Sequence, residues 1–176
     1  MSRFRPLRRR LGSGVQLAAR AVDDYASRIA ELLERYGVVL TKPTLGQPVE
    51  LLEADDGSLS FELLGALPDA REPAGSTLEV RERFRAIGGD RYERDGYEYE
   101  LVDRQRSFRR AFHFHDPEWF KRHFLVLVHE HCEQPLGDPA CEHYQALPLR
   151  DGYAGVTALI GAWTAEPSCS ELRCLE

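Results

Sequence analysis

Between positions 77 and 114, apolar and charged residues alternate along the chain. In "TLEVRERFRAI" apolar side chains alternate with glutamate and arginine, and "SFRRAFHFHD" repeats the pattern with phenylalanine. Successive side chains of a strand point to opposite faces, so a period of two predicts strands with one buried face. Turns are predicted at the Gly-Gly-Asp sequence 88–90 and at Asp95-Gly96. The sequence therefore predicts one antiparallel sheet, a meander, over residues 78–132.

Two segments outside this region have the period of an amphipathic helix. From Ser13 to Tyr36 apolar residues recur at steps of three and four, and Gly37 follows as a stop signal. The segment "RDGYAGVTALIGAWT", at 150–164, has the same period. A short helix is also predicted at 117–123, because an acid and a proline open it. The predicted fold class is α+β: an antiparallel sheet with a long N-terminal helix and a C-terminal helix packed against it.

Composition divides the chain into three stretches. Residues 1–12 form a basic tail, with five arginines in the first ten positions, and are predicted to be flexible. Residues 13–66 hold the N-terminal helix and short strands, and residues 77–176 hold the sheet, a His/Cys cluster and the C-terminal helix. The segment 67–76 is rich in proline and charge, as is typical of a linker. A chain of 176 residues suits one domain, so we expect both larger stretches to form one compact unit.

Charge is distributed unevenly along the chain. The net charge is −6, yet the tail is strongly basic. Such a tail can contact nucleic acid or an acidic partner, so nucleic acid, or a partner protein bound through the tail and the N-terminal helix, is one expectation. No run of eighteen apolar residues and no apolar signal core occurs. We therefore expect a cytoplasmic protein of the bacterial or archaeal type that does not contact a membrane.

The cysteines are interpreted in the same terms. In the cytoplasm the four cysteines of this chain are expected to be free thiols or metal ligands rather than disulfides. Cys169 and Cys174, near the end of the chain, are interpreted as two free thiols on a terminal tail. Alternatively, they donate ligands to a second site or form an oxidisable pair. No cysteine lies in a known catalytic context, so the sequence assigns no catalytic residue.

The histidines are concentrated in three short stretches. Five of the six occur in "HFHD" at 113–116, "HEHCE" at 129–133 and "CEH" at 141–143. Within each stretch, two histidines or a cysteine and a histidine are two positions apart. Side chains two apart in a strand project from the same face, so each pair presents its ligand atoms on one surface. If the two strands with paired histidines are neighbours, four imidazoles converge.

This ligand chemistry predicts a metal site. Zinc takes imidazole and thiolate ligands in tetrahedral sites, and an imidazole-rich set also suits iron, nickel or copper. Nearby carboxylates can orient the imidazoles. The sequence has no pair of C-x-x-C elements and no H-E-x-x-H motif, so no known motif is assigned. The residues predicted to hold the metal are His113, His115, His129, His131, Cys132, Cys141 and His143.

Two other functions use parts of the same chain. Paired histidines can act as base and acid in RNA cleavage, as in a toxin-like ribonuclease, while arginines stabilise the developing phosphate charge. Alternatively, the chain is an interaction domain without enzymatic activity, which binds through its tail and N-terminal helix. Under the ribonuclease interpretation, the phosphate contacts are Arg104, Arg106, Arg109 and Arg110.

Overall fold

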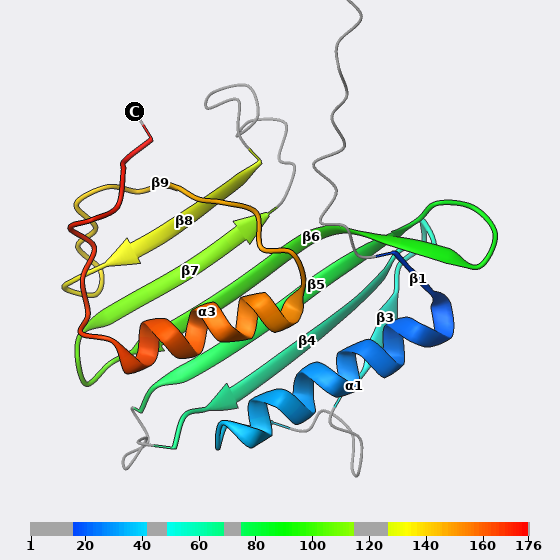
Figure 1. Cartoon of the computed structure of the whole chain (residues 1–176), viewed down its shortest axis with the longest axis horizontal. Coiled ribbons are helices and arrows are strands. Elements are labelled where there is room, and N and C mark those ends of the chain that lie inside the picture. The colour runs from blue at the N-terminus through cyan, green and yellow to red at the C-terminus, as the bar shows by residue number, and fades with distance from the viewer. Residues whose placement is uncertain (1–15, 42–48, 69–74, 115–126, 176) are drawn as a thin grey trace, which may run out of the picture.

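The computed structural model describes residues 16–41, 49–68, 75–114 and 127–175. These residues form a nine-stranded sheet with α1 (Ala19–Arg35) and α3 (Gly152–Thr164) on one face (Figure 1). The predicted α+β class and the two predicted longer helices are thereby confirmed. The predicted start of the first helix at Ser13 is wrong, because residues 16–18 form β1, which pairs with β6 (Arg91–Asp103), and α1 begins at Ala19. The basic tail at 1–12, His115 and the helix predicted at 117–123 lie outside the described residues.

Neighbouring strands of the sheet are antiparallel throughout, in the order β2-β4-β5-β6-β7-β8-β9. In addition, β1 pairs with the start of β6, and β3 pairs with β4 beside β2. Because β4 and β5 are paired, the sheet continues across the segment 67–76. The strands are β1 (Gln16–Ala18), β2 (Val39–Leu40), β3 (Leu51–Glu53), β4 (Leu59–Ala66), β5 (Thr77–Ala86), β6 (Arg91–Asp103), β7 (Phe108–Phe114), β8 (Val128–Glu133) and β9 (Tyr144–Gln145).

The turn predicted at Asp95-Gly96 is wrong. Strand β6 runs through both residues, and its register against β5 shifts there, between Arg83 and Phe84. Asp95 is the extra residue of this bulge, and its carboxylate lies 2.9 Å from Nε of Arg83 across the strand pair. A Cβ at Gly96 would stand 3.3 Å from the carbonyl oxygen of Phe114. The glycine therefore marks a bulge and a close backbone approach rather than a chain reversal.

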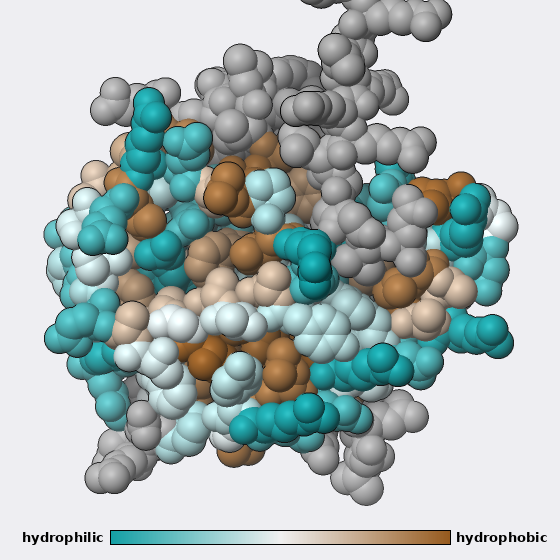
Figure 2. All heavy atoms as spheres, viewed as in Figure 1, coloured by the Kyte–Doolittle hydropathy of each residue, from teal (hydrophilic) through white to brown (hydrophobic). Residues whose placement is uncertain are grey.

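The two faces of the sheet differ in character. Under α1 and α3 the side chains are buried and mostly apolar, and hydrophobic atoms are visible between the two helices, whereas the outer side of α1 is hydrophilic (Figure 2). On the opposite face, Arg81 lies between glutamates of β4, β5 and β6, and Arg109 lies between glutamates of β6 and β8. Because Arg81, Glu98, His113 and His129 are in register across β5 to β8, the histidines share this charged face.

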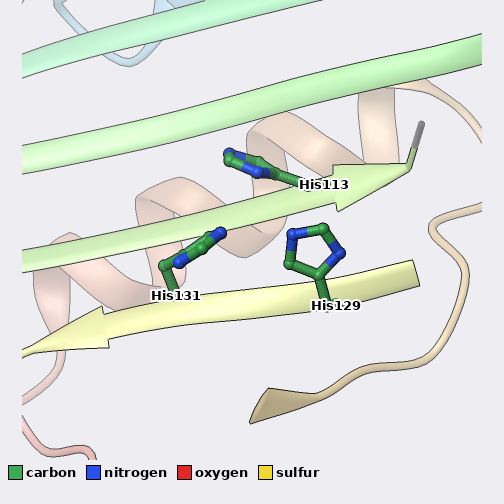
Figure 3. Close-up of side chains that lie close together, drawn as sticks. All are labelled: His113, His129 and His131. Atoms are coloured by element: carbon green, nitrogen blue, oxygen red, sulfur yellow. The ribbon is translucent and has the colours of Figure 1, made fainter. Parts of the chain in front are cut away.

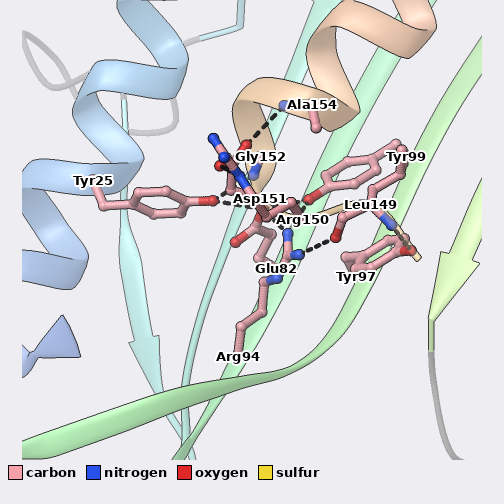
Figure 4. A network of polar contacts seen from close by, with 10 residues as sticks. All are labelled: Tyr25, Glu82, Arg94, Tyr97, Tyr99, Leu149, Arg150, Asp151, Gly152 and Ala154. Atoms are coloured by element: carbon pink, nitrogen blue, oxygen red, sulfur yellow. Dashed lines mark hydrogen bonds and ion pairs between the residues drawn. The ribbon is translucent and has the colours of Figure 1, made fainter. Parts of the chain in front are cut away.

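One ion pair lies inside the core, between the sheet and the helices (Figure 4). Glu82 of β5 and Arg94 of β6 have fully buried side chains, with Glu82 Oε1 2.9 Å from Nη1 of Arg94. The Tyr25 and Tyr99 hydroxyls donate to the same carboxylate oxygen, and Arg94 donates to the Leu149 carbonyl. Burial raises the pKa of both tyrosines, so their hydroxyls stay protonated donors. The network ties α1, the sheet and the approach to α3 together.

Both ends of α3 are fixed by side chains. Asp151 is the N-cap, and its carboxylate accepts a hydrogen bond of 2.9 Å from the Ala154 amide. At the other end, Arg106 donates to the carbonyl oxygens of Trp163 and Ala165. These carbonyls lie at the negative end of the helix dipole, which a guanidinium stabilises.

Gly155 determines how closely α3 packs on the sheet. A Cβ there would stand 2.4 Å from the Tyr99 ring, nearer than carbon atoms approach. Replacing Gly155 with alanine is therefore expected to lower the free energy of unfolding by about 1–3 kcal/mol, because the helix must move away from β6. Gly161→Ala is the matched control, since a Cβ there meets nothing within 4 Å. Urea unfolding measures both, and wild-type stability in the Gly155 variant would contradict this packing.

Candidate metal site

Three histidines from two neighbouring strands converge on the charged face of the sheet. His113 in β7 lies directly opposite His129 in β8, and His131 follows two positions later on the same face. One ligand atom from each ring lies within 4.8 Å of the other two. Figure 3 shows the three side chains projecting from β7 and β8 toward one another. Strands β7 and β8 are paired neighbours, which is the condition under which the sequence analysis expects their imidazoles to converge.

The spacing of the rings suits a tetrahedral ion. The ring centres are 5.2 Å apart for His113 and His129, 4.7 Å for His113 and His131, and 5.0 Å for His129 and His131. Zinc binds imidazole nitrogens at about 2.0–2.1 Å, which places tetrahedral nitrogens about 3.3 Å apart and ring centres about 5 Å apart. The rings already have this separation, so small rotations of the side chains would close the nitrogens around an ion.

A fourth histidine stands against the same group. His143, one residue before β9, has its ring centre 5.2 Å from that of His129 and 4.9 Å from that of His131. It does not belong to the set whose ligand atoms lie within 4.8 Å of one another. A cavity of about 280 Å³ borders this side of the cluster. Among its lining residues are His131, Glu133, Glu142 and His143.

The surroundings of His131 favour its neutral form. Burial, then the Arg109 guanidinium and His143, lower the pKa of His131 to about 4. A hydrogen bond to the Glu142 backbone opposes this shift and holds one side of the ring. A neutral imidazole with one nitrogen bonded to the protein binds a metal through the other nitrogen. His131 is therefore in the state that ligation requires at neutral pH.

Comparison with known proteins does not assign the site. No protein-family model, curated protein or solved structure matches the chain. The case for a metal therefore depends on the convergence of the three rings, their separations and the neutral state of His131.

The cysteines are not available as thiolates. Cys132 is bonded to Cys169, and Cys141 is bonded to Cys174. The prediction of free thiols is therefore wrong, and Cys132 and Cys141 cannot serve as the predicted thiolate ligands. Cys132 also lies on the face opposite His131, because it is the next residue in β8. The even number of cysteines was the available signal, but the pairing depends on the fold and not on the spacing.

The four arginines predicted to contact phosphate do not form one surface. Arg109 lies on the histidine face between two glutamates, whereas Arg110 lies on the opposite face and pairs with Glu130. Arg106 binds the end of α3, and Arg104 is exposed in the turn after β6. Three of the four therefore have partners within the chain, which accounts for them without a nucleic acid.

Proposed function

We propose that the protein binds one divalent transition-metal ion through His113, His129 and His131, and that zinc is the preferred ion. The observation that carries this proposal is the convergence of the three ring nitrogens within 4.8 Å from two paired strands. Three imidazoles are a ligand set that zinc takes in proteins, and the remaining position is filled by water in hydrolytic sites or by a fourth side chain in structural sites.

Nearby carboxylates support a positive ion at this place. Glu98 lies opposite His113 in β6, and Glu133 lies two positions after His131 on the same face of β8. Arg109 lies on the same face, four residues before His113, and forms ion pairs with Glu100 and Glu133. The surrounding charge therefore offsets part of the charge of a dication, and carboxylates of this kind orient ligating imidazoles.

The nitrogen-only ligand set predicts which metals bind. Imidazole suits zinc, copper, nickel and iron, whereas magnesium and calcium take oxygen ligands. Calorimetric titration of the full chain, first stripped with a chelator, is expected to show one equivalent of zinc and no binding of magnesium. Zinc is also expected to raise the melting temperature, because it binds the folded state. An absence of saturable zinc binding would contradict the proposed function.

The disulfides of the described chain bear on where the protein works. Neither described helix combines the length and apolar character needed to cross a membrane. Two disulfides, Cys132–Cys169 and Cys141–Cys174, are present. Structural disulfides persist in oxidising compartments and are rare in the cytosol. We therefore propose that the protein works in an oxidising compartment. The cytoplasmic location remains a prediction from the sequence. Ribonuclease activity and partner binding also remain predictions from the sequence.

A further inference from the structure

We infer that His143 is the fourth ligand of the metal site and that the Cys141–Cys174 disulfide holds it in reach, so that tight metal binding requires the oxidised chain. This inference rests on the proposed function. With His143 bound, four histidines fill the coordination positions of the ion. The metal affinity of the site then depends on whether the Cys141–Cys174 pair is oxidised.

His143 lies beside the three proposed ligands. Its ring contacts two of the three proposed ligands, at centre separations of 5.2 Å from His129 and 4.9 Å from His131. These values match the separation of about 5 Å expected for imidazoles on one tetrahedral ion. Because His143 is not part of the set whose ligand atoms lie within 4.8 Å of one another, ligation requires its ring to move toward that set. Its backbone already lies within reach.

The backbone of His143 is held from two sides. The segment 143–145 lies between β8 and the C-terminal residues 173–175. The His143 carbonyl accepts a hydrogen bond of 2.9 Å from the Leu175 amide, and the Gln145 amide donates one of 2.8 Å to the Arg173 carbonyl. Tyr144 forms an antiparallel bridge with Cys174. On one side His143 is therefore positioned by the last residues of the chain.

The Cys141–Cys174 disulfide makes this support covalent. Cys141 is two residues before His143, and Cys174 is the residue that bridges to β9. The disulfide therefore links the segment that carries His143 directly to the C-terminal segment that supports it. Without the disulfide, the support of residues 143–145 by residues 173–175 depends on non-covalent contacts, which are the two hydrogen bonds and the bridge. We expect the segment around His143 to gain freedom, so that the entropy of ordering His143 weakens metal binding.

The redox step is a simple exchange. A dithiol reductant attacks the Cys141–Cys174 bond, two electrons and two protons convert the pair to two thiols, and the dithiol becomes a disulfide. The resulting thiols are themselves ligands for zinc. Chemical reduction alone therefore mixes two effects, and serine variants, which remove the disulfide without creating thiols, separate them.

The other disulfide provides a matched control. Cys132–Cys169 spans 37 residues and Cys141–Cys174 spans 33, so the two close loops of similar length. By the chain-entropy account their removal affects stability to a similar degree. Cys132, however, points to the face opposite the histidines. Only the Cys141–Cys174 bond is attached to the segment that carries His143.

The test is calorimetric titration with zinc of the full chain and four variants. We expect Cys141→Ser/Cys174→Ser and His143→Ala each to weaken zinc binding by at least about tenfold. Cys132→Ser/Cys169→Ser is expected to retain wild-type affinity. Adding His143→Ala to the Cys141→Ser/Cys174→Ser chain is expected to cause no further loss, because both changes remove the same ligand. Circular dichroism checks that each variant is folded, and His143→Ala tests the ligand with both disulfides intact.

Three results would overturn the inference. The first is wild-type zinc affinity in His143→Ala. The second is wild-type affinity in the folded Cys141→Ser/Cys174→Ser chain. The third is an equal loss in both disulfide variants, which would show a general effect of stability. In each case the wild-type chain still binds zinc, so the proposed function survives. If the oxidised wild type binds no zinc, the proposed function fails and this inference fails with it.

Discussion

Replacing His129 with alanine is expected to reduce zinc affinity by at least about 100-fold. Its side chain is 1 % exposed, and its ring contacts those of His113, His131 and His143. Like His131, it contacts every other ring of the cluster. Loss of a residue that only orients a ligand reduces metal affinity by about 10–100-fold, and loss of a ligand removes more. Competition with a chromophoric chelator measures the change.

The control for this experiment is Val128→Ala. Val128 precedes His129 in β8, is buried, and points to the opposite face of the sheet. Its truncation leaves a cavity and lowers stability, yet it removes no ligand, so zinc affinity is expected to stay at the wild-type value. Zinc should raise the melting temperature of this variant but not that of His129→Ala. Equal zinc affinity in the two variants would rule out His129 as a ligand.

Replacing Arg94 with methionine is expected to lower the free energy of unfolding by about 3–5 kcal/mol. The change leaves Glu82 as a buried carboxylate without its guanidinium partner, and burial already raises the pKa of Glu82. Arg94 also donates to the Leu149 carbonyl and lies over the Tyr97 ring, with its Cζ 4.8 Å from the ring centre. Urea unfolding at neutral pH measures the loss.

A second ion pair between the same two strands is the control. Arg85 of β5 and Glu93 of β6 are 3.2 Å apart, and the Arg85 side chain is 63 % exposed. Arg85→Met is therefore expected to lower stability by less than about 1 kcal/mol. Replacing Glu82 and Arg94 together by leucine and methionine should be less destabilising than Arg94→Met alone, because no unpaired charge remains. Similar losses at Arg85 and Arg94 would show that burial does not determine the effect.

The fold could be predicted because its main elements follow from local periodicity. Alternation placed β5 and β7, and the three- and four-residue period placed α1 and α3, where the apolar stripes are buried as expected. The turn predicted at Asp95-Gly96 is wrong because the same dipeptide can form a β-bulge inside a strand that is paired on both sides. A long strand paired on both sides is a property of the sheet, which no local sequence window contains.

The candidate site was predictable in part for the same reason. Spacing placed His129 and His131 on one face, but the distance to His143 depends on the path of the chain after β8. One signal of a buried polar network was present in the alternation: Glu82 occupies a position whose neighbours at two-residue steps, Val80 and Phe84, are apolar and buried. Its partner Arg94 could not be identified, because the bulge changes the register beside it.

The two edges of the sheet affect how copies of the chain can associate. On one side β4 is bordered by the two- and three-residue strands β2 and β3, and on the other side β9 is bridged to the last residues of the chain. Long, flat outer strands invite a neighbouring molecule to extend the sheet, and short or covered ones discourage this. The segment that supports His143 therefore also protects the sheet against intermolecular strand addition.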